Sequence, residues 1–194
     1  MLSARRGTRV HQDIDHVLFS EEDILEGIEA VAAKVTDAYR GQEWTVVSIL
    51  KGSCIFASDL VRRIPIPLQM AFVAARSYGK GTESGDLHVD FLPNGDEIEG
   101  CNILLVDDIL DTGRTMHALK NELLARGASQ VKTCVFLDKP SRRELHLEPD
   151  FRVFEVQNEF VVGYGLDFAG RYRNLPYVGA LKSAVFECPD GEKA

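Results

Sequence analysis

Residues 103–115 read "ILLVDDILDTGRT", in which an apolar run typical of a buried strand passes into three aspartates and a threonine-glycine turn. Acids near a helix N-terminus often cap the helix and favour its dipole, which would account for one or two of these carboxylates. Capping does not account for Asp107, Asp108 and Asp111 together, followed directly by Thr-Gly-Arg-Thr. The stretch therefore predicts a ligand site at the end of a core strand.

The turn that follows Asp111 has the composition of a phosphate-binding loop, formed by Thr112, Gly113, Arg114 and Thr115. Successive backbone N–H groups, a glycine without side-chain bulk and threonine hydroxyls can surround a phosphate at a helix N-terminus. The carboxylates suit the vicinal hydroxyls of a sugar, which can each donate to a carboxylate oxygen. Together they describe a site for a ribose 5-phosphate. The glycines of a Walker loop or a G-x-G-x-x-G motif are missing, which disfavours nucleotide hydrolysis and dinucleotide binding.

Apolar strands alternate with helical patterns on both sides of this stretch. Helices are expected from Ser20 to Gly41, over residues 54–64 and over 115–126, and strands over 45–50, 69–75, 102–106 and 131–137. Continuous apolar strands separated by helices are typical of an α/β fold, a mostly parallel sheet with helices on both faces. Ligands of such sheets bind at the carboxyl ends of the strands, where Asp107, Asp108 and Asp111 would lie.

The chain of 194 residues is expected to form a single domain, residues 1–194, with a loose N-terminal tail over 1–13 and a C-terminal tail over 188–194. Shorter strand-like segments from about residue 150 to 185, without a long helix, predict a small hood subdomain added to the sheet. The glycine-rich stretch 76–87 is polar and reads as a loop.

Composition limits the classes of partner. A net charge of −8 disfavours nucleic-acid binding, which usually leaves a basic footprint. The cysteines, at 54, 101, 134 and 188, are too far apart for a zinc motif and predict reduced thiols of a cytoplasmic protein. Arg5, Arg6 and Arg9 are not followed by an apolar stretch, so no secretory signal is expected. No apolar run approaches the roughly 18 residues of a membrane helix.

The motif "LLVDDILDTGRT", residues 104–115, closely resembles the signature of type I phosphoribosyltransferases. These enzymes bind 5-phosphoribosyl 1-pyrophosphate and transfer its ribose phosphate to a nucleobase. Hypoxanthine-guanine members carry an aspartate at the position of Asp111, whereas adenine, orotate and pyrimidine-regulatory members usually do not. "LKGS" (50–53), "SYG" (77–79), "FLDKP" (136–140), "FVVGYGLDF" (160–168) and "RYRNLPYVG" (171–179) are also similar to bacterial hypoxanthine members, so the resemblance covers about residues 44–179.

The resemblance implies roles around the purine base. Asp111 would accept the proton from purine N7 as N9 attacks the anomeric carbon. Lys139 would donate to the 6-oxo group, Phe160 would stack on the base, and Val161 would offer backbone hydrogen bonds to its edge. Backbone carbonyls near Asp167 would read the 2-position.

The resemblance also implies how the sugar phosphate is held. Asp107 and Asp108 would bind the ribose hydroxyls, although the family often has a longer glutamate at the first position. The turn at Lys51 and Gly52, which often contains a cis peptide, and Arg173 would bind the pyrophosphate. Asp167 would bind Mg²⁺ through water, with Asp107 and Asp108 as indirect metal contacts. Ser77 and Tyr78 would belong to a lid over the reacting centre.

The expected activity is therefore the conversion of hypoxanthine, and also guanine, to the 5′-monophosphate by a homodimer or homotetramer. A preference for xanthine stays open. A nucleotide-sensing RNA-binding regulator on the same fold is a second alternative, disfavoured by the net charge and by Asp111. Adenine is disfavoured because its amine would meet the Lys139 donor with another donor.

Overall fold

The computed structural model describes residues 10–77 and 87–186 of the chain. A six-stranded sheet forms the body of the protein, and all its neighbouring strands are parallel except the antiparallel pair β3 and β4. Across the sheet the strands lie in the order β4 (Leu87–Phe91), β3 (Gln69–Ser77), β2 (Trp44–Leu50), β5 (Asn102–Leu110), β6 (Gln130–Asp138), β7 (Phe151–Glu155). The predicted α/β fold with a mostly parallel sheet is confirmed.

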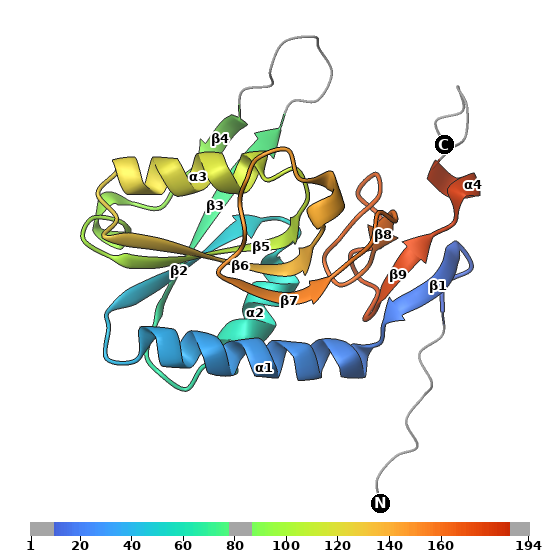
Figure 1. Cartoon of the computed structure of the whole chain (residues 1–194), viewed down its shortest axis with the longest axis horizontal. Coiled ribbons are helices and arrows are strands. Elements are labelled where there is room, and N and C mark those ends of the chain that lie inside the picture. Colours follow the sequence, from blue (N-terminus) through green and yellow to red (C-terminus); the bar gives the residue numbers. More distant parts are fainter. Residues whose placement is uncertain (1–9, 78–86, 187–194) are drawn as a thin grey trace, which may run out of the picture.

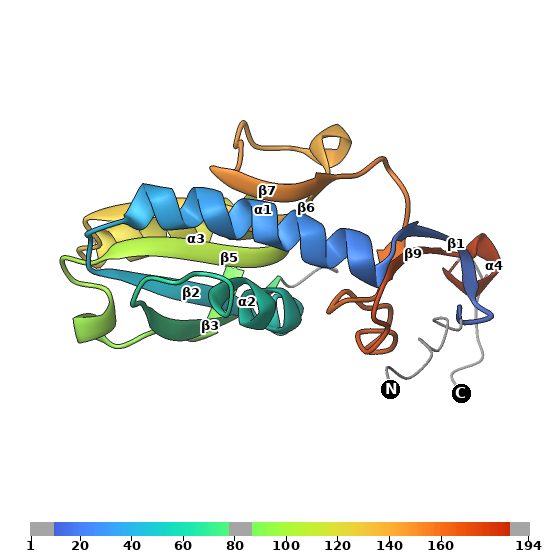
Figure 2. The same cartoon turned by 90° about the horizontal axis from the view of Figure 1, so that it is seen from below.

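Helices cover both faces of this sheet (Figure 1). Helices α1 (Glu21–Tyr39) and α2 (Cys54–Val61) pack on one face, against alternate residues of the central strands such as Leu104 and Val106. Helix α3 (Arg114–Ala125) packs on the other face, against Ile103 and Leu105. The two views in Figures 1 and 2 place α3 and α1 on opposite sides of the strands. Burial on both faces explains the unbroken apolar runs of the central strands.

Local signals in the sequence explain where α1 begins and ends. The Ser20 side chain accepts from the Asp23 N–H (3.2 Å), and the Asp23 carboxylate accepts from the Ser20 N–H (2.9 Å), which completes a capping box. The helix ends at Arg40, and Gly41 follows with φ +74°, the left-handed conformation that glycine adopts without strain. In α2, Phe56, Ala57 and Leu60 are buried, whereas Ile55 is 37% exposed.

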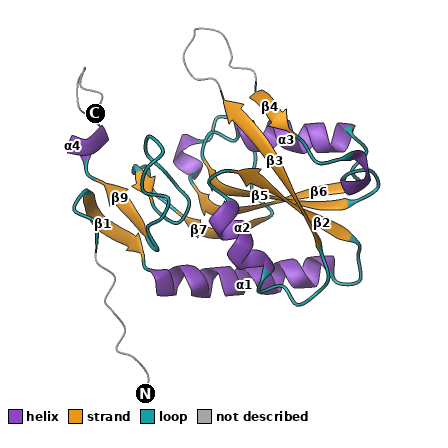
Figure 3. Cartoon of the chain, turned by 180° about the vertical axis from the view of Figure 1, so that it is seen from behind, coloured by secondary structure: helices purple, strands orange, loops and turns teal. Residues whose placement is uncertain are grey.

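A second, three-stranded antiparallel sheet forms the hood, in the order β1 (Ile14–Phe19), β9 (Val178–Leu181), β8 (Val161–Val162). It has its own small core of Ile14, Val162, Tyr177 and Leu181. The hood lies beyond one end of the main sheet, with helix α4 (Ser183–Phe186) at its outer side (Figure 3). Two short 3₁₀ helices, η1 (Gly95–Glu97) and η2 (Pro140–Arg142), complete the described elements.

The hood differs from its predicted limits. The segment Phe151–Glu155, expected to belong to it, forms β7 and pairs in parallel with β6 in the main sheet. The prediction was wrong there because a five-residue edge strand with no helix before it has no βαβ pattern to identify it. The hood also takes β1 from the other end of the chain, and no sequence pattern connects β1 with β9 across more than 150 residues.

The expected N-terminal tail over residues 1–13 is ordered at its end. The His11 N–H donates to the Tyr177 hydroxyl (2.8 Å), and the Asp13 carboxylate accepts from the Tyr172 hydroxyl (2.8 Å). The prediction of a loose tail is therefore wrong for residues 11–13. Residues 1–9 and the predicted C-terminal tail, 188–194, lie outside the described residues. Within the described ranges no helix has the length and apolar character needed to cross a membrane.

Candidate active site

Asp107 and Asp108 lie within strand β5, because the pairing of β5 with β6 continues to Leu110. The Asp107 carboxylate accepts the N–H of Asp108 (2.9 Å), and the Asp108 carboxylate accepts the N–H of Ile109 (3.0 Å). Burial raises the pKa of Asp107 well above its ordinary value, and the neighbouring Asp108 charge adds to the effect. Burial also raises the pKa of Asp108, which Arg173 opposes. Two adjacent, desolvated carboxylates thus lie near the carboxyl end of the central strand.

A cavity of about 340 Å³ opens where β5 passes into α3. Gly113 precedes α3 with φ +85°, a left-handed conformation that favours glycine, and this turn brings the loop to the helix N-terminus. The cavity is lined by Asp107, Asp108, Ile109, Leu110, Asp111, Thr112, Gly113, Thr115 and Met116. The predicted phosphate loop therefore surrounds a cavity, with the exception of the Arg114 side chain. Arg114 instead forms an ion pair with Glu144 (2.6 Å).

A second cavity, of about 260 Å³, adjoins the first beneath the hood. Its lining comes from the ends of β5 and β6 and from the hood: Asp108, Ile109, Asp111, Lys139, Arg142, Phe160, Val161, Leu166 and Asp167. The two cavities share Asp108, Ile109 and Asp111. The sequence placed Asp111, Lys139, Phe160, Val161 and Asp167 around one base site, and the structure brings these side chains to one cavity.

Lys139 follows β6 and is 7% exposed. Its ammonium donates to the carbonyl of Glu159 (2.6 Å) in the segment that leads into the hood. Burial lowers the pKa of Lys139, and the nearby Asp111 charge opposes this. The ammonium has three donors, so it can reach a second acceptor in the cavity while it holds the Glu159 carbonyl.

Asp111 is held by two consecutive arginines that the sequence analysis missed. Arg142 Nε lies 2.9 Å from Asp111 Oδ1, and Arg143 Nε donates to the Asp111 carbonyl (3.0 Å). Arg143 is nearly buried and also donates to the carbonyls of Leu110 (3.3 Å) and Leu147 and to the fully buried Asp138 carboxylate. The predicted motif "FLDKP" ends just before these residues, and Asp111, which both of them bind, lies about 30 positions earlier in sequence. No sequence pattern marks such contacts.

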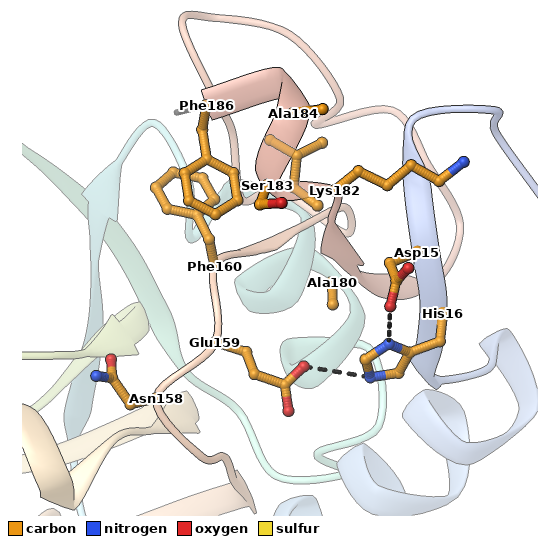
Figure 4. Close-up of a pocket in the computed structure, with 11 residues that line it drawn as sticks. Asp15, His16, Asn158, Glu159, Phe160, Ala180, Lys182, Ser183, Ala184 and Phe186 are labelled. Carbon is orange, nitrogen blue, oxygen red and sulfur yellow. Dashed lines mark hydrogen bonds and ion pairs between the residues drawn. The ribbon is translucent and has the colours of Figure 1, made fainter. Parts of the chain in front are cut away.

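Phe160 forms one wall of the base cavity and is 41% exposed. Figure 4 shows its ring against that of Phe186, and the two stack with centroids 5.0 Å apart and an interplanar angle of 21°. This contact belongs to a further cavity of about 540 Å³ on the outer side of the hood, where Glu159 Oε2 also lies 3.2 Å from His16 Nε2. Of the predicted site residues only Phe160 lines it, so we assign the chemistry to the smaller pair of cavities.

Asp167 and Arg173 bind one another in this structure. Arg173 Nη2 lies 2.5 Å from Asp167 Oδ1, and the Gly170 N–H donates to Asp167 Oδ2 (2.8 Å). Arg173 also donates to the carbonyl of Gly165. Both residues therefore lie at the hood side of the site, and Asp167 also lines the base cavity.

The turn after β2 contains Lys51 and Gly52 and lies against Asp108 of β5. The Leu50–Lys51 peptide is cis, as the resemblance implied. A Cβ on Gly52 would lie 1.6 Å from Asp108 Oδ2, and a Cβ on Gly165 would lie 2.1 Å from the Gly52 carbonyl oxygen. Glycine at both positions thus permits the turn, the acid and the hood loop to meet. The Lys51 side chain is exposed and lines neither cavity.

The predicted lid lies at the edge of the described residues. Ser77 is the last residue of β3, and Tyr78 lies outside the described residues, so the predicted lid has no structural account here. Among the residues that the structure describes, no cluster of three or more histidine, cysteine or acidic side chains could hold a metal ion.

Comparison with known proteins identifies the family. A family model described as "Phosphoribosyl transferase domain" matches residues 18–169. The chain is 43% identical over 178 residues to "Bifunctional protein TilS/HprT" of Listeria monocytogenes, and this match covers 91% of the chain but 27% of that protein. It is 42% identical over 176 residues to "Hypoxanthine-guanine phosphoribosyltransferase" of Bacillus subtilis, covering 90% of the chain and 97% of that protein.

Among solved structures, a hypoxanthine phosphoribosyltransferase from Staphylococcus aureus superimposes with a TM-score of 0.86 at 40% sequence identity. The match covers 91% of this chain and 96% of that one. Similarity of this extent spans both the main sheet and the hood, and the chain belongs to the phosphoribosyl transferase family, among its hypoxanthine-guanine members.

Proposed function

We propose that this chain is a purine-salvage enzyme that transfers the 5-phosphoribosyl group of 5-phosphoribosyl 1-pyrophosphate to hypoxanthine, and also to guanine. The products are IMP or GMP and pyrophosphate. One observation carries the proposal: the phosphate-loop cavity and the cavity containing Lys139 adjoin and share Asp108 and Asp111. A ribose phosphate and a 6-oxopurine can therefore meet at these carboxylates.

The sugar phosphate occupies the cavity at the start of α3. The backbone N–H groups and hydroxyls of residues 112–115 bind the 5-phosphate, with the N-terminal end of the helix dipole behind it. Asp107 and Asp108 accept hydrogen bonds from the ribose hydroxyls. Their negative charge also offsets the positive charge that develops on the sugar when the bond to pyrophosphate breaks.

The purine occupies the cavity under the hood. Lys139 donates to the 6-oxo group, and Phe160 stacks on the ring with the face that does not contact Phe186. The backbone of Val161 contacts the edge of the base, and carbonyls near Asp167 read the 2-position. A donor at the 6-position favours hypoxanthine and guanine over adenine, because adenine would present a second donor.

Asp111 acts as the base of the reaction. As N9 of the purine forms its bond to the anomeric carbon, N7 gives its proton to the Asp111 carboxylate, and the bond to pyrophosphate breaks with its electron pair on the leaving oxygen. A carboxylate is a weak base in water, so its placement against the purine must supply much of the effect. Both cavities are lined by Asp111, which is the position this step requires.

Mg²⁺ fits the donors that surround the site. Asp107, Asp108 and Asp167 offer oxygen atoms, which Mg²⁺ prefers, but the described residues hold no cluster that would bind the ion alone. Asp167 would bind it through water, with indirect contacts from Asp107 and Asp108. When bound, the ion neutralises charge on the pyrophosphate. Arg173 and the turn at Lys51 and Gly52 add positive charge and backbone donors on the same side.

Two further features complete the proposal. The lid that the resemblance implies at Ser77 and Tyr78 would exclude water, which would otherwise hydrolyse the activated sugar; Tyr78 lies outside the described residues. The chain assembles as a homodimer or homotetramer. Static light scattering at micromolar concentration that gives the monomer mass, 21.6 kDa, would contradict the assembly without affecting the proposed reaction.

Steady-state kinetics on the full chain test the proposed activity. Hypoxanthine, guanine, xanthine and adenine are each supplied with 5-phosphoribosyl 1-pyrophosphate and Mg²⁺, and nucleotide and pyrophosphate are both quantified. We expect turnover of hypoxanthine and guanine, with adenine the poorest substrate. A higher kcat/KM for xanthine would make the chain a xanthine enzyme, and no turnover of any base would favour a regulatory protein.

A further inference from the structure

Arg142 occupies a fixed place beside the purine cavity. It ends the short 3₁₀ helix η2, whose first residue, Pro140, follows Lys139 directly. The Arg142 N–H donates to the Lys139 carbonyl (3.1 Å), which closes one 3₁₀ turn. Lys139 stands just before this helix and Arg142 at its end, and the two side chains line the same cavity.

The partner of Arg142 in this cavity is Asp111. Arg142 Nε lies 2.9 Å from Asp111 Oδ1, within ion-pair distance. The Oδ1 atom is buried, and no hydrogen bond of good geometry reaches it from the described residues. Among the described residues, the ion pair with Arg142 is therefore the contact that holds the Oδ1 atom.

The adjacent arginine serves the same residue in a different way. Arg143 is only 10% exposed and binds the backbone carbonyl of Asp111, whereas Arg142 is 49% exposed and binds its side chain. Arg143 thus fixes where Asp111 lies, and Arg142 fixes where its carboxylate points. Because Arg142 is half exposed, its contribution to folding is expected to be small, which separates its role from that of Arg143.

We infer that Arg142 is a positioning residue for the phosphoribosyl transfer: it binds Oδ1 of Asp111 and leaves Oδ2 directed at N7 of the purine. This inference rests on the proposed function and adds a residue to it. Loss of Arg142 allows the Asp111 carboxylate to rotate, so the proton acceptor is misplaced while the phosphate loop stays intact. Misplacement of a reacting group by about 1 Å lowers turnover by up to roughly a hundredfold.

A double-mutant cycle of Arg142→Gln and Asp111→Asn on the full chain tests this. In the wild-type background we expect Arg142→Gln to lower kcat on hypoxanthine by roughly ten- to a hundredfold. The KM for 5-phosphoribosyl 1-pyrophosphate and the thermal midpoint should stay near their wild-type values. In the Asp111→Asn background the same change should have less than about a twofold effect on kcat, because the carboxylate that Arg142 positions is no longer present.

Arg126→Gln is the matched control, since Arg126 forms a similar half-exposed pair with Glu122 (Nε to Oε1, 2.7 Å) on α3 and lines neither cavity. Arg142→Lys should restore part of the lost kcat. Equal fold losses in both backgrounds would overturn the inference, as would a wild-type kcat in Arg142→Gln. A wild-type chain inactive on all four purines would overturn the proposed function itself, and the positioning role with it.

Discussion

Asp111 is the residue on which the proposed chemistry depends. Replacing Asp111 by Asn keeps the size of the side chain and removes the proton acceptor. We expect kcat on hypoxanthine to fall by roughly two to four orders of magnitude, the usual contribution of a general base. Binding of 5-phosphoribosyl 1-pyrophosphate, measured by calorimetry, should change little because the phosphate loop remains. Near-normal turnover would remove Asp111 from the mechanism.

Lys139 is the residue proposed to distinguish oxo from amino groups at the 6-position of the purine. Glutamine can present either a donor or an acceptor there, so Lys139→Gln should raise kcat/KM for adenine relative to hypoxanthine. The Lys139 ammonium also holds the Glu159 carbonyl (2.6 Å), so some loss of activity on both bases is expected. The ratio of the two kcat/KM values is the measurement. If that ratio does not change, Lys139 does not read the 6-position.

Among individual residues, the sequence predicted those that belong to motifs and missed those that act through distant partners. Asp111, Lys139 and Phe160 lie in recognisable motifs, and all three line the predicted base cavity. Arg142 looks like an ordinary surface charge in the sequence, because its partner Asp111 lies about 30 residues earlier, in the loop after β5. Arg114 was expected to belong to the phosphate loop, and its side chain forms an ion pair with the exposed Glu144.

Contacts between elements bring the hood over the ends of the strands. One close contact is at Gly165, where the backbone adopts φ +101° and approaches the Gly52 carbonyl. An alanine there would place its Cβ 2.1 Å from that oxygen, closer than any relaxed contact. Gly165→Ala should therefore displace the hood loop from the 51–53 turn and weaken binding of 5-phosphoribosyl 1-pyrophosphate. We expect a loss of roughly 2 kcal/mol or more in the free energy of unfolding.

Gly170→Ala is the control for Gly165→Ala. Gly170 also has a positive φ, +79°, but a Cβ there would meet nothing within 4 Å. Gly170→Ala should lower the free energy of unfolding, measured by chemical denaturation, only by the backbone strain of about 1 kcal/mol. Binding of 5-phosphoribosyl 1-pyrophosphate should stay nearly unchanged. Equal effects of the two substitutions would mean that the contact of Gly165 with Gly52 does not position the hood.

Elements were predictable where the βαβ pattern repeats and less so elsewhere. The strands β2, β3, β5 and β6 and the three long helices were expected from apolar runs, glycine turns and capping residues. The antiparallel edge strand β4 and the assignment of β7 to the main sheet were not, since both are short and lack a crossover helix. The hood of β1, β9 and β8 depends on pairing between the two ends of the chain, which local patterns do not encode.

For the molecule as a whole, charge predicts how its substrate binds. The chain has a net charge of −8, and Asp107, Asp108 and Asp111 line the cavity proposed to bind a highly anionic ligand. The carboxylates repel the phosphate groups of the ligand. 5-Phosphoribosyl 1-pyrophosphate should therefore bind as its Mg²⁺ complex, and the purine should bind productively afterwards. Calorimetry with Mg²⁺ and with excess chelator measures the difference. Equal affinity in chelator would show that the protein's own cations suffice and that Asp167 has no metal role.

The central claim is that the two adjoining cavities hold the two parts of one nucleotide. A crystal structure of the chain with IMP tests it most directly. We predict the phosphate at the N–H groups of residues 112–115, the ribose hydroxyls at Asp107 and Asp108, and the hypoxanthine oxygen at Lys139 with the ring against Phe160. Nucleotide bound in the outer hood cavity beside His16 and Glu159, or with its base away from Lys139, would contradict the account.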